Sequence, residues 1–217
     1  MIRPFGYMEF MFILEATRWT ILLSLIAFVG GSIGGLIVAL CRISASRLLS
    51  YPASGFIRLI QGTPLLMQLF LIFFAAPVLG LSVEPLLAAA IGLSLNASAF
   101  LGEIWRGCIQ SIPKGQWDAS RALGLHYFKR MRYVILPQAI PIALPPTVGF
   151  LVQLIKATSL AAIIGFTELT RAGQIINNAT LRPFLVFGMV AAIYFILCWP
   201  LSVLSERLER RYALAGK

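Results

Sequence analysis

The sequence predicts an all-α integral membrane protein with about five transmembrane helices. Of its 217 residues, 59% are hydrophobic and only 12% are charged, and the mean hydropathy is +0.87. Soluble domains of this size carry about twice that share of charged residues, so we expect a membrane protein. Because one helical span takes ~20 apolar residues, the length accommodates about five spans with short connections. We expect residues 1–217 to form a single transmembrane domain.

The first expected span covers residues 19–41. It contains two pairs of glycines at helical spacing, Gly30/Gly34 and Gly31/Gly35. Small residues four apart lie on one face of a membrane helix and let another helix approach closely. We therefore expect this face to pack against a second span.

The remaining spans follow the apolar runs in chain order. Residues 51–60 are expected to lie along the membrane before Gly62 and Pro64 turn the chain. The next spans are expected at residues 65–78, 85–110, 139–164 and 183–204. Three prolines, Pro141, Pro145 and Pro146, predict kinks or a break in the fourth span. In the polar segment 165–182, Thr167 is expected to cap a short surface helix whose first turn holds Glu168.

A charged stretch, residues 114–137, interrupts the apolar pattern and carries five of the eighteen basic residues. We expect a short helix at 116–123, ended by Gly124 in the left-handed conformation that glycine adopts at little cost. A second helix at 127–135 is expected to stop before Pro137. Two short basic helices that project from the membrane surface suit the docking of a soluble partner.

The basic residues predict the orientation, because cytoplasmic loops of membrane proteins are enriched in lysine and arginine. Five spans place thirteen basic residues on one side and four on the other, while Lys156 lies within a span. The larger set is Arg42, Arg47, Arg58, Arg106, Lys114, Arg121, Lys129, Arg130, Arg132, Arg207, Arg210, Arg211 and Lys217; the smaller is Arg3, Arg18, Arg171 and Arg182. We expect the N-terminus outside, and the C-terminus and the charged stretch in the cytoplasm.

Polar residues within the spans fall at helical spacing and mark candidate positions along a substrate pathway. They are Gln61 and Gln68, then Asn96 and Glu103, then Gln153 and Lys156. Charged groups at membrane depth are costly and usually functional. Two structural alternatives remain open at this point: a Glu103–Lys156 ion pair, or a side chain that extends from a helix end toward water.

An enzyme is not predicted. The single histidine, His126, has no cysteine or carboxylate cluster nearby, and Cys41, Cys108 and Cys198 lack the spacing of metal ligands or a disulfide framework. The chain also lacks the glycine-rich phosphate loop of ATPases. Energy for active transport would then come from another subunit or from an ion gradient.

The charged stretch resembles the cytoplasmic E-A-A loop of permease subunits of type I ABC importers. In that motif E-A-A is followed by a glycine and then by I-x-L-P; here the matching residues are Asp118, Ala119 and Ser120, then Gly124, then Val134 to Pro137. The resemblance implies a type I permease fold and a loop that couples the spans to an ATPase. The coupling residues that it implies are Asp118, Ala119, Ser120, Gly124, Leu136 and Pro137.

Further motifs resemble the polar amino acid importers, whose substrates include histidine, glutamine, arginine and cystine. Residues 61–65, Q-G-T-P-L, are similar to that family's R-G-T-P-L, and residues 156–160, K-A-T-S-L, to its K-D-T-S-L. The second motif adds Thr158 and Ser159 to the pathway candidates. Gln61 and Ala157 depart from the family pattern and remove one cation and one anion near the presumed pathway.

The resemblance implies a bacterial inner-membrane permease for polar amino acids or related compounds such as opines. Its partners would be a second permease subunit, identical or paralogous, two cytoplasmic ATPases and an external substrate-binding protein. No cofactor is expected in this chain, because ATP and magnesium would bind the partner ATPase. The alternative is a secondary transporter or channel that uses Glu103 and Lys156 for ion coupling. We detect no inverted repeat in support of that alternative.

Overall fold

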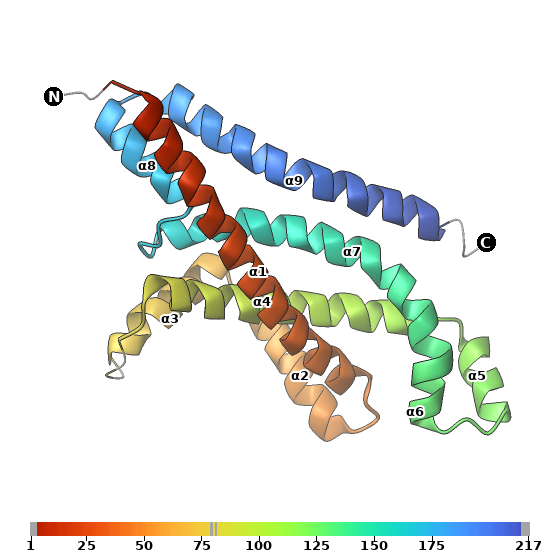
Figure 1. Cartoon of the computed structure of the whole chain (residues 1–217). Coiled ribbons are helices and arrows are strands. Elements are labelled where there is room, and N and C mark those ends of the chain that lie inside the picture. The colour runs from red at the N-terminus through yellow and green to blue at the C-terminus, as the bar shows by residue number, and fades with distance from the viewer. Residues whose placement is uncertain (1–3, 79, 81, 214–217) are drawn as a thin grey trace.

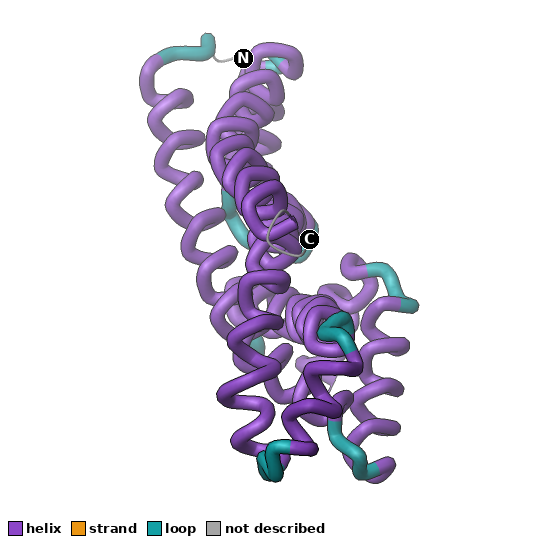
Figure 2. Tube along the Cα trace, turned by 90° about the vertical axis from the view of Figure 1, so that its right-hand side faces the viewer, coloured by secondary structure: helices purple, strands orange, loops and turns teal. Residues whose placement is uncertain are grey.

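The chain folds into helices joined by short loops, as a computed structural model describes for residues 4–78, 80 and 82–213 (Figures 1 and 2). Arg3 and Lys217, which the orientation count includes, lie outside the described residues. In chain order the helical elements of the described residues are α1 (Tyr7–Ile43), α2 (Arg47–Gln61), α3 (Leu65–Val78), α4 (Pro85–Gln110), α5 (Lys114–Ala122), α6 (Tyr127–Arg130), the π-helical η1 (Met131–Ile135), α7 (Leu136–Ala157), the 3-10 helix η2 (Thr158–Ala162), α8 (Leu169–Thr180) and α9 (Pro183–Ala213).

The number of candidate spans agrees with the predicted five. Within the described ranges, four helices are long and apolar enough to cross a membrane: α1, α4, the continuous helix Tyr127–Ala162, and α9. Helices α2 and α3 are bent by 99° at their junction and make a fifth candidate when they are taken together. The expected second span at 65–78 is too short to cross alone, because 14 helical residues reach only ~21 Å. When α2 and α3 are taken together as one broken span, the combined length is sufficient to cross the membrane.

Among the described helices, α1 and α4 form the most extensive pair, and glycines make their close contact possible. A Cβ atom at Gly31 would lie 2.3 Å from the Cβ of Ala97, and one at Gly34 would lie 2.2 Å from the Oγ of Ser98. The packing role predicted for these glycines is therefore confirmed. Leu23, Leu69, Leu93 and Leu154 are buried alongside this contact and bring α3 and α7 onto the same core.

The helix that was expected to stop before Pro137 continues through it, so that prediction is wrong. The α-helical hydrogen bonds give way to a π-helical segment over Met131–Ile135, and Pro137 then occupies the second position of α7. A proline that follows a change of hydrogen-bond register removes an N–H group that has no regular partner there. Pro141, Pro145 and Pro146 also lie inside α7 without breaking it. The ribbon turns between α6 and the middle of α7 (Figure 1).

Several helix ends differ from the predicted boundaries. Helix α1 begins at Tyr7, well before residue 19, where Glu9 accepts a hydrogen bond from the Gly6 N–H at 2.9 Å and stabilises the first turn. Helix α9 continues past residue 204 to Ala213. Helix α5 begins at Lys114 and not at residue 116, so Asp118 lies in its middle. The cap of α8 is Glu168 and not Thr167.

Candidate functional site

A cavity of about 610 Å³ lies between the α2–α3 corner, α4 and α7. Its volume falls within the range of roughly 300–1,000 Å³ that is typical of small-molecule sites. Three of the predicted pathway residues line it from three different elements: Gln61 at the end of α2, Asn96 on α4 and Gln153 on α7. The fold thus brings together side chains that are far apart in the sequence.

The amide groups of these three side chains make no hydrogen bond to other residues in the described part of the chain. Gln61 and Gln153 are exposed to the cavity, whereas Asn96 is 9% exposed. Buried polar groups in folded proteins are almost always paired, so an unpaired amide at this burial indicates a site for a polar ligand. Each amide offers both a carbonyl acceptor and an N–H₂ donor.

An aromatic pair forms the apolar part of the cavity wall. Phe100 of α4 and Phe150 of α7 are stacked, with ring centroids 5.6 Å apart and an angle of 18° between the ring planes. Ile104 and Leu154 extend this apolar surface. The cavity therefore combines three unpaired amides with a hydrocarbon lining, the mixture that is typical of sites for small polar molecules.

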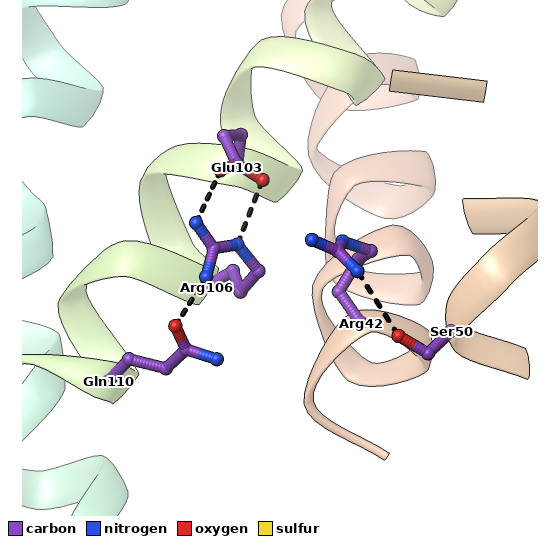
Figure 3. Close-up of polar contacts among 5 residues, drawn as sticks. All are labelled: Arg42, Ser50, Glu103, Arg106 and Gln110. Carbon is purple, nitrogen blue, oxygen red and sulfur yellow. Dashed lines mark hydrogen bonds and ion pairs between the residues drawn. The ribbon is translucent and has the colours of Figure 1, made fainter. Parts of the chain in front are cut away.

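Glu103 has its counter-ion on its own helix, as Figure 3 shows. Arg106 Nε donates to Glu103 Oε2 at 2.9 Å, and a second guanidinium N–H of Arg106 donates to Glu103 Oε1. Arg106 also donates to Gln110 Oε1, which joins three residues along α4. Among the described residues Glu103 therefore pairs with Arg106 and not with Lys156.

A second basic side chain, that of Arg42 on α1, extends toward these hydrogen-bonded residues of α4 (Figure 3). Arg42 donates from Nη1 to the Oγ of Ser50 on α2 at 3.1 Å, and its guanidinium lies on the side of α1 that faces Glu103 and Arg106 (Figure 3). The two arginines and one carboxylate leave a net positive charge between α1, α2 and α4. These charged side chains are not part of the cavity wall, and the spacing of Asn96 and Glu103 alone did not indicate this arrangement.

Four other predicted pathway residues lie away from the cavity wall. Gln68 Nε2 donates to the Ile60 carbonyl oxygen at 2.7 Å and lies 2.9 Å from Thr63 Oγ1, so it stabilises the α2–α3 corner. Thr158 is fully buried and donates to the Ile155 carbonyl oxygen. Ser159 donates to the carbonyl oxygen of Lys156, whose own side chain is exposed. These contacts hold the helices in place.

The charged stretch forms two helical segments joined by a tight turn. Gly124 has φ of 70°, the left-handed conformation that was expected. Its N–H donates to the Arg121 carbonyl oxygen at 2.8 Å, and the N–H of Leu125 donates to the Ser120 carbonyl oxygen at 3.1 Å. This pair of hydrogen bonds is the Schellman motif, which closes the end of α5.

Most of the residues expected to couple the loop to a partner are exposed on this turn. Asp118, Ala119 and Gly124 are exposed, and Asp118 forms an exposed ion pair with Arg121 at 3.3 Å. Ser120 is buried, and its hydroxyl donates to the Trp117 carbonyl oxygen. Leu136 and Pro137 begin α7, beside the cluster of Ile109, Ile112, Met131 and Ile135 that anchors the loop.

Sequence reasoning missed a buried polar cluster centred on Glu168. This side chain is 0% exposed and caps α8 by accepting the N–H of Arg171 at 2.9 Å. It also accepts the hydroxyl of Tyr194 on α9 at 2.8 Å and that of Thr20 on α1 at 3.4 Å. Burial raises the pKa of Glu168 above its ordinary value. Its two hydroxyl partners, Tyr194 and Thr20, are 26 and 148 residues away along the chain, so no local sequence pattern indicates the cluster.

The helical spans, the amide-lined cavity between them and the projecting loop define an integral membrane protein of the transport-permease class. The chain belongs to the family of binding-protein-dependent transport system inner membrane components, whose pattern matches residues 31–214. It is therefore an inner-membrane protein with several spans. The match runs from the middle of α1 through the projecting loop to the end of α9.

Individual relatives are similar along nearly their whole length. The chain is 39% identical over 205 residues to the probable amino-acid ABC transporter permease protein YckA of Bacillus subtilis (strain 168), covering 94% of this chain and 91% of that protein. It is 42% identical over 194 residues to the L-cystine transport system permease protein TcyB of the same organism, covering 89% and 83%. In the crystal structure of an amino acid ABC transporter with histidines, a chain 34% identical superposes with a TM-score of 0.88, covering 96% of this chain and 100% of that one.

Proposed function

We propose that this chain is the permease subunit of an ATP-driven importer for polar amino acids or related compounds, and that residues 1–217 act as one permease domain. The observation that carries the proposal is the similarity, over 96% of the chain, to a solved amino acid ABC transporter at 34% identity. The names of the two Bacillus relatives, one for amino acids and one for L-cystine, support the substrate class.

The work of the chain would be to form the translocation pathway and to couple it to a partner ATPase. ATP and magnesium would bind that partner, since the sequence lacks a glycine-rich phosphate loop. A second permease subunit, two ATPases and a substrate-binding protein would complete the assembly. The exposed turn around Gly124, within residues 114–137, would dock on the ATPase.

The arrangement of the helices supports the predicted orientation. The N-terminal end of α1 and helix α8 lie at one end of the molecule, whereas α5, α6 and the connection from α1 to α2 lie toward the opposite end (Figure 1). The positive-inside rule would place the latter end in the cytoplasm. In this orientation the docking turn faces a cytoplasmic ATPase, and α8 faces the side where a binding protein delivers substrate.

The contacts of the two charged pathway candidates favour an importer over an ion-coupled secondary transporter. Glu103 is held by two hydrogen bonds from Arg106, while Lys156 lies on α7 outside the cavity wall. A coupling ion would have to displace the guanidinium from Glu103. Family membership also points to transport that depends on a binding protein.

Purification and reconstitution of the complex test this proposal. The tagged chain, expressed in its native bacterium, should co-purify with an ABC ATPase. In vesicles, uptake of the amino acid bound by the cognate binding protein should require ATP and should stop when the phosphate-loop lysine of the ATPase is replaced by alanine. Uptake that follows an imposed ion gradient without ATP would refute the proposal.

A further inference from the structure

We infer that the cavity between α2, α4 and α7 binds amino acids whose side chains are polar but uncharged, and that it disfavours cationic and anionic side chains. This inference rests on the proposed function and specifies its substrate class. No charged side chain lines the cavity in the described part of the chain. The polar side chains of its wall are the amides of Gln61, Asn96 and Gln153 and the hydroxyl of Thr63.

Three unpaired amides suit the polar groups of a neutral amino acid. The α-carboxylate accepts N–H groups, the α-ammonium donates to carbonyl oxygens, and an amide side chain needs both kinds of partner. Asn96 is the strongest single indicator, because it is nine-tenths buried and has no hydrogen-bond partner among the described residues. The hydroxyl of Thr63 is already used, since it donates to the Leu59 carbonyl oxygen at 2.9 Å.

The rest of the cavity wall is apolar, so binding an amino acid with a charged side chain would cost free energy. Phe100 and Phe150 stack across α4 and α7, and Ile104 and Leu154 continue the apolar surface. A full charge in such surroundings loses its hydration and needs an opposite charge to compensate. The two main-chain charges of an amino acid partly balance each other, whereas an additional side-chain charge has no partner in the wall.

The nearest charged groups along α4 and α7 are not available as that partner. Glu103 lies seven residues beyond Asn96, but both of its oxygens accept hydrogen bonds from Arg106. The guanidinium of Arg42 faces the same pair and adds positive charge (Figure 3). A cationic substrate side chain would therefore meet a carboxylate that is already neutralised. Lys156 is exposed on α7 and does not line the wall.

Direct binding to the purified permease–ATPase complex in lipid nanodiscs tests the inference, without the binding protein and its own selectivity. Radiolabelled glutamine would be displaced by unlabelled glutamine, serine, arginine or glutamate. We expect arginine and glutamate to compete on the order of tenfold less well than glutamine, because their extra charge is buried without a partner.

A gain-of-function variant provides the second measurement. Ala157 lines the cavity, so Ala157→Asp places a carboxylate in its wall. This variant should raise the affinity for arginine and lower that for glutamate, whereas the matched uncharged variant Ala157→Asn should show neither change. Stimulation of ATP hydrolysis by the loaded binding protein checks that each variant complex is assembled.

The outcomes separate this inference from the proposed function. Stronger binding of arginine or glutamate than of glutamine by the unmodified complex would overturn the inference, as would unchanged preferences in an assembled Ala157→Asp complex. Absence of amino acid binding in a complex that the loaded binding protein still stimulates would also overturn it, while the importer assignment would stand. A complex that never responds to the binding protein would instead contradict the proposed function.

Discussion

Glu103 and Arg106 lie three residues apart on α4, and their side chains form a bidentate ion pair that is partly exposed. The sequence alone places Glu103 among the candidate pathway residues, with an ion pair to Lys156 as the structural alternative. Its contacts suggest a different role, the neutralisation of Arg106 beside the positive charge of Arg42. Removing the carboxylate would leave two arginines close together without compensation.

We predict that Glu103→Gln lowers uptake and destabilises the folded complex by about 1 kcal/mol, the magnitude typical of partly exposed ion pairs. The double variant Glu103→Gln/Arg106→Gln should recover most of both losses, because it removes the uncompensated cation. Thermal unfolding and uptake by the same preparations measure the two effects. If the double variant transports no better than Glu103→Gln alone, the carboxylate acts on the substrate directly.

Glu168 provides a prediction that depends on pH. Its pKa is raised in the folded protein, so the folded state favours the protonated form. The stability that this provides is fully present below about pH 4, the ordinary range of a glutamate, and is lost as the pH rises through the higher folded pKa. We expect Glu168→Gln, which stays neutral, to reduce this loss of stability with rising pH.

The matched variant Glu168→Ala should be destabilised at all pH values by about 1–3 kcal/mol. It removes the cap of α8 and the acceptor for the hydroxyls of Thr20 and Tyr194. Thermal unfolding from pH 5 to pH 8 distinguishes the two variants. The same pH dependence in Glu168→Gln and the unmodified protein would show that Glu168 does not titrate in this range.

At the scale of helices, the contact between α1 and α4 depends on the absence of side chains at the glycines of α1. We predict that Gly31→Ala destabilises the protein by about 1–3 kcal/mol, because its Cβ would lie 2.3 Å from that of Ala97, which has no rotamer to change. Gly107→Ala is the matched control on α4, since nothing lies within 4 Å of its added Cβ. It should be neutral or stabilising by up to ~1 kcal/mol. Equal unfolding temperatures for Gly31→Ala and the unmodified protein would contradict this packing.

The helices that the sequence predicted well are those whose limits are set locally. The apolar run at 85–110 begins after Glu84 with a proline and matches α4, and Gly124 ends α5 through a local turn. The predictions failed where contacts with distant residues, or a change of hydrogen-bond register, determine where a helix begins or ends. Pro137 is tolerated because of the π-helical turn before it, and α3 needs α2 to complete a span.

In the candidate site, too, the features set by local sequence could be predicted and those set by distant contacts could not. Helical spacing singled out Gln61, Asn96 and Gln153, but it gave the same weight to Gln68 and Lys156, which the fold directs elsewhere. The three-residue spacing of Glu103 and Arg106 is itself typical of an ion pair within one helix, and this pair forms in place of the alternative contact between Glu103 and Lys156. The Glu168 cluster required the tertiary structure, because its hydroxyl partners come from α1 and α9.

For the whole molecule, the orientation can be tested with cysteines placed at opposite ends. Lys129 in α6 and Asn178 in α8 are both exposed, so a cysteine at either position is accessible to a reagent on its own side. In intact cells without an outer membrane, we predict that a membrane-impermeant thiol reagent labels Asn178→Cys and not Lys129→Cys. Opening the membrane should make both react. Labelling of Lys129→Cys in intact cells would reverse the orientation.

We propose that movements of an ATPase reach the spans through the turn at Gly124. Because Gly124 has φ of 70° and open space around its added Cβ, Gly124→Asn and Gly124→Asp are strained to a similar extent, by roughly 1 kcal/mol or less. Only the aspartate adds a charge that must lose its hydration when the turn docks. The two variants therefore separate docking from folding.

The most direct measurement is ATP hydrolysis and amino acid uptake by the same reconstituted complexes, with and without loaded binding protein. For the unmodified chain we predict that loaded binding protein stimulates hydrolysis and drives uptake. Gly124→Asn should retain most of both activities, whereas Gly124→Asp should lose uptake and its stimulated hydrolysis should fall to the unstimulated rate. Normal stimulation together with normal uptake in Gly124→Asp would contradict the account.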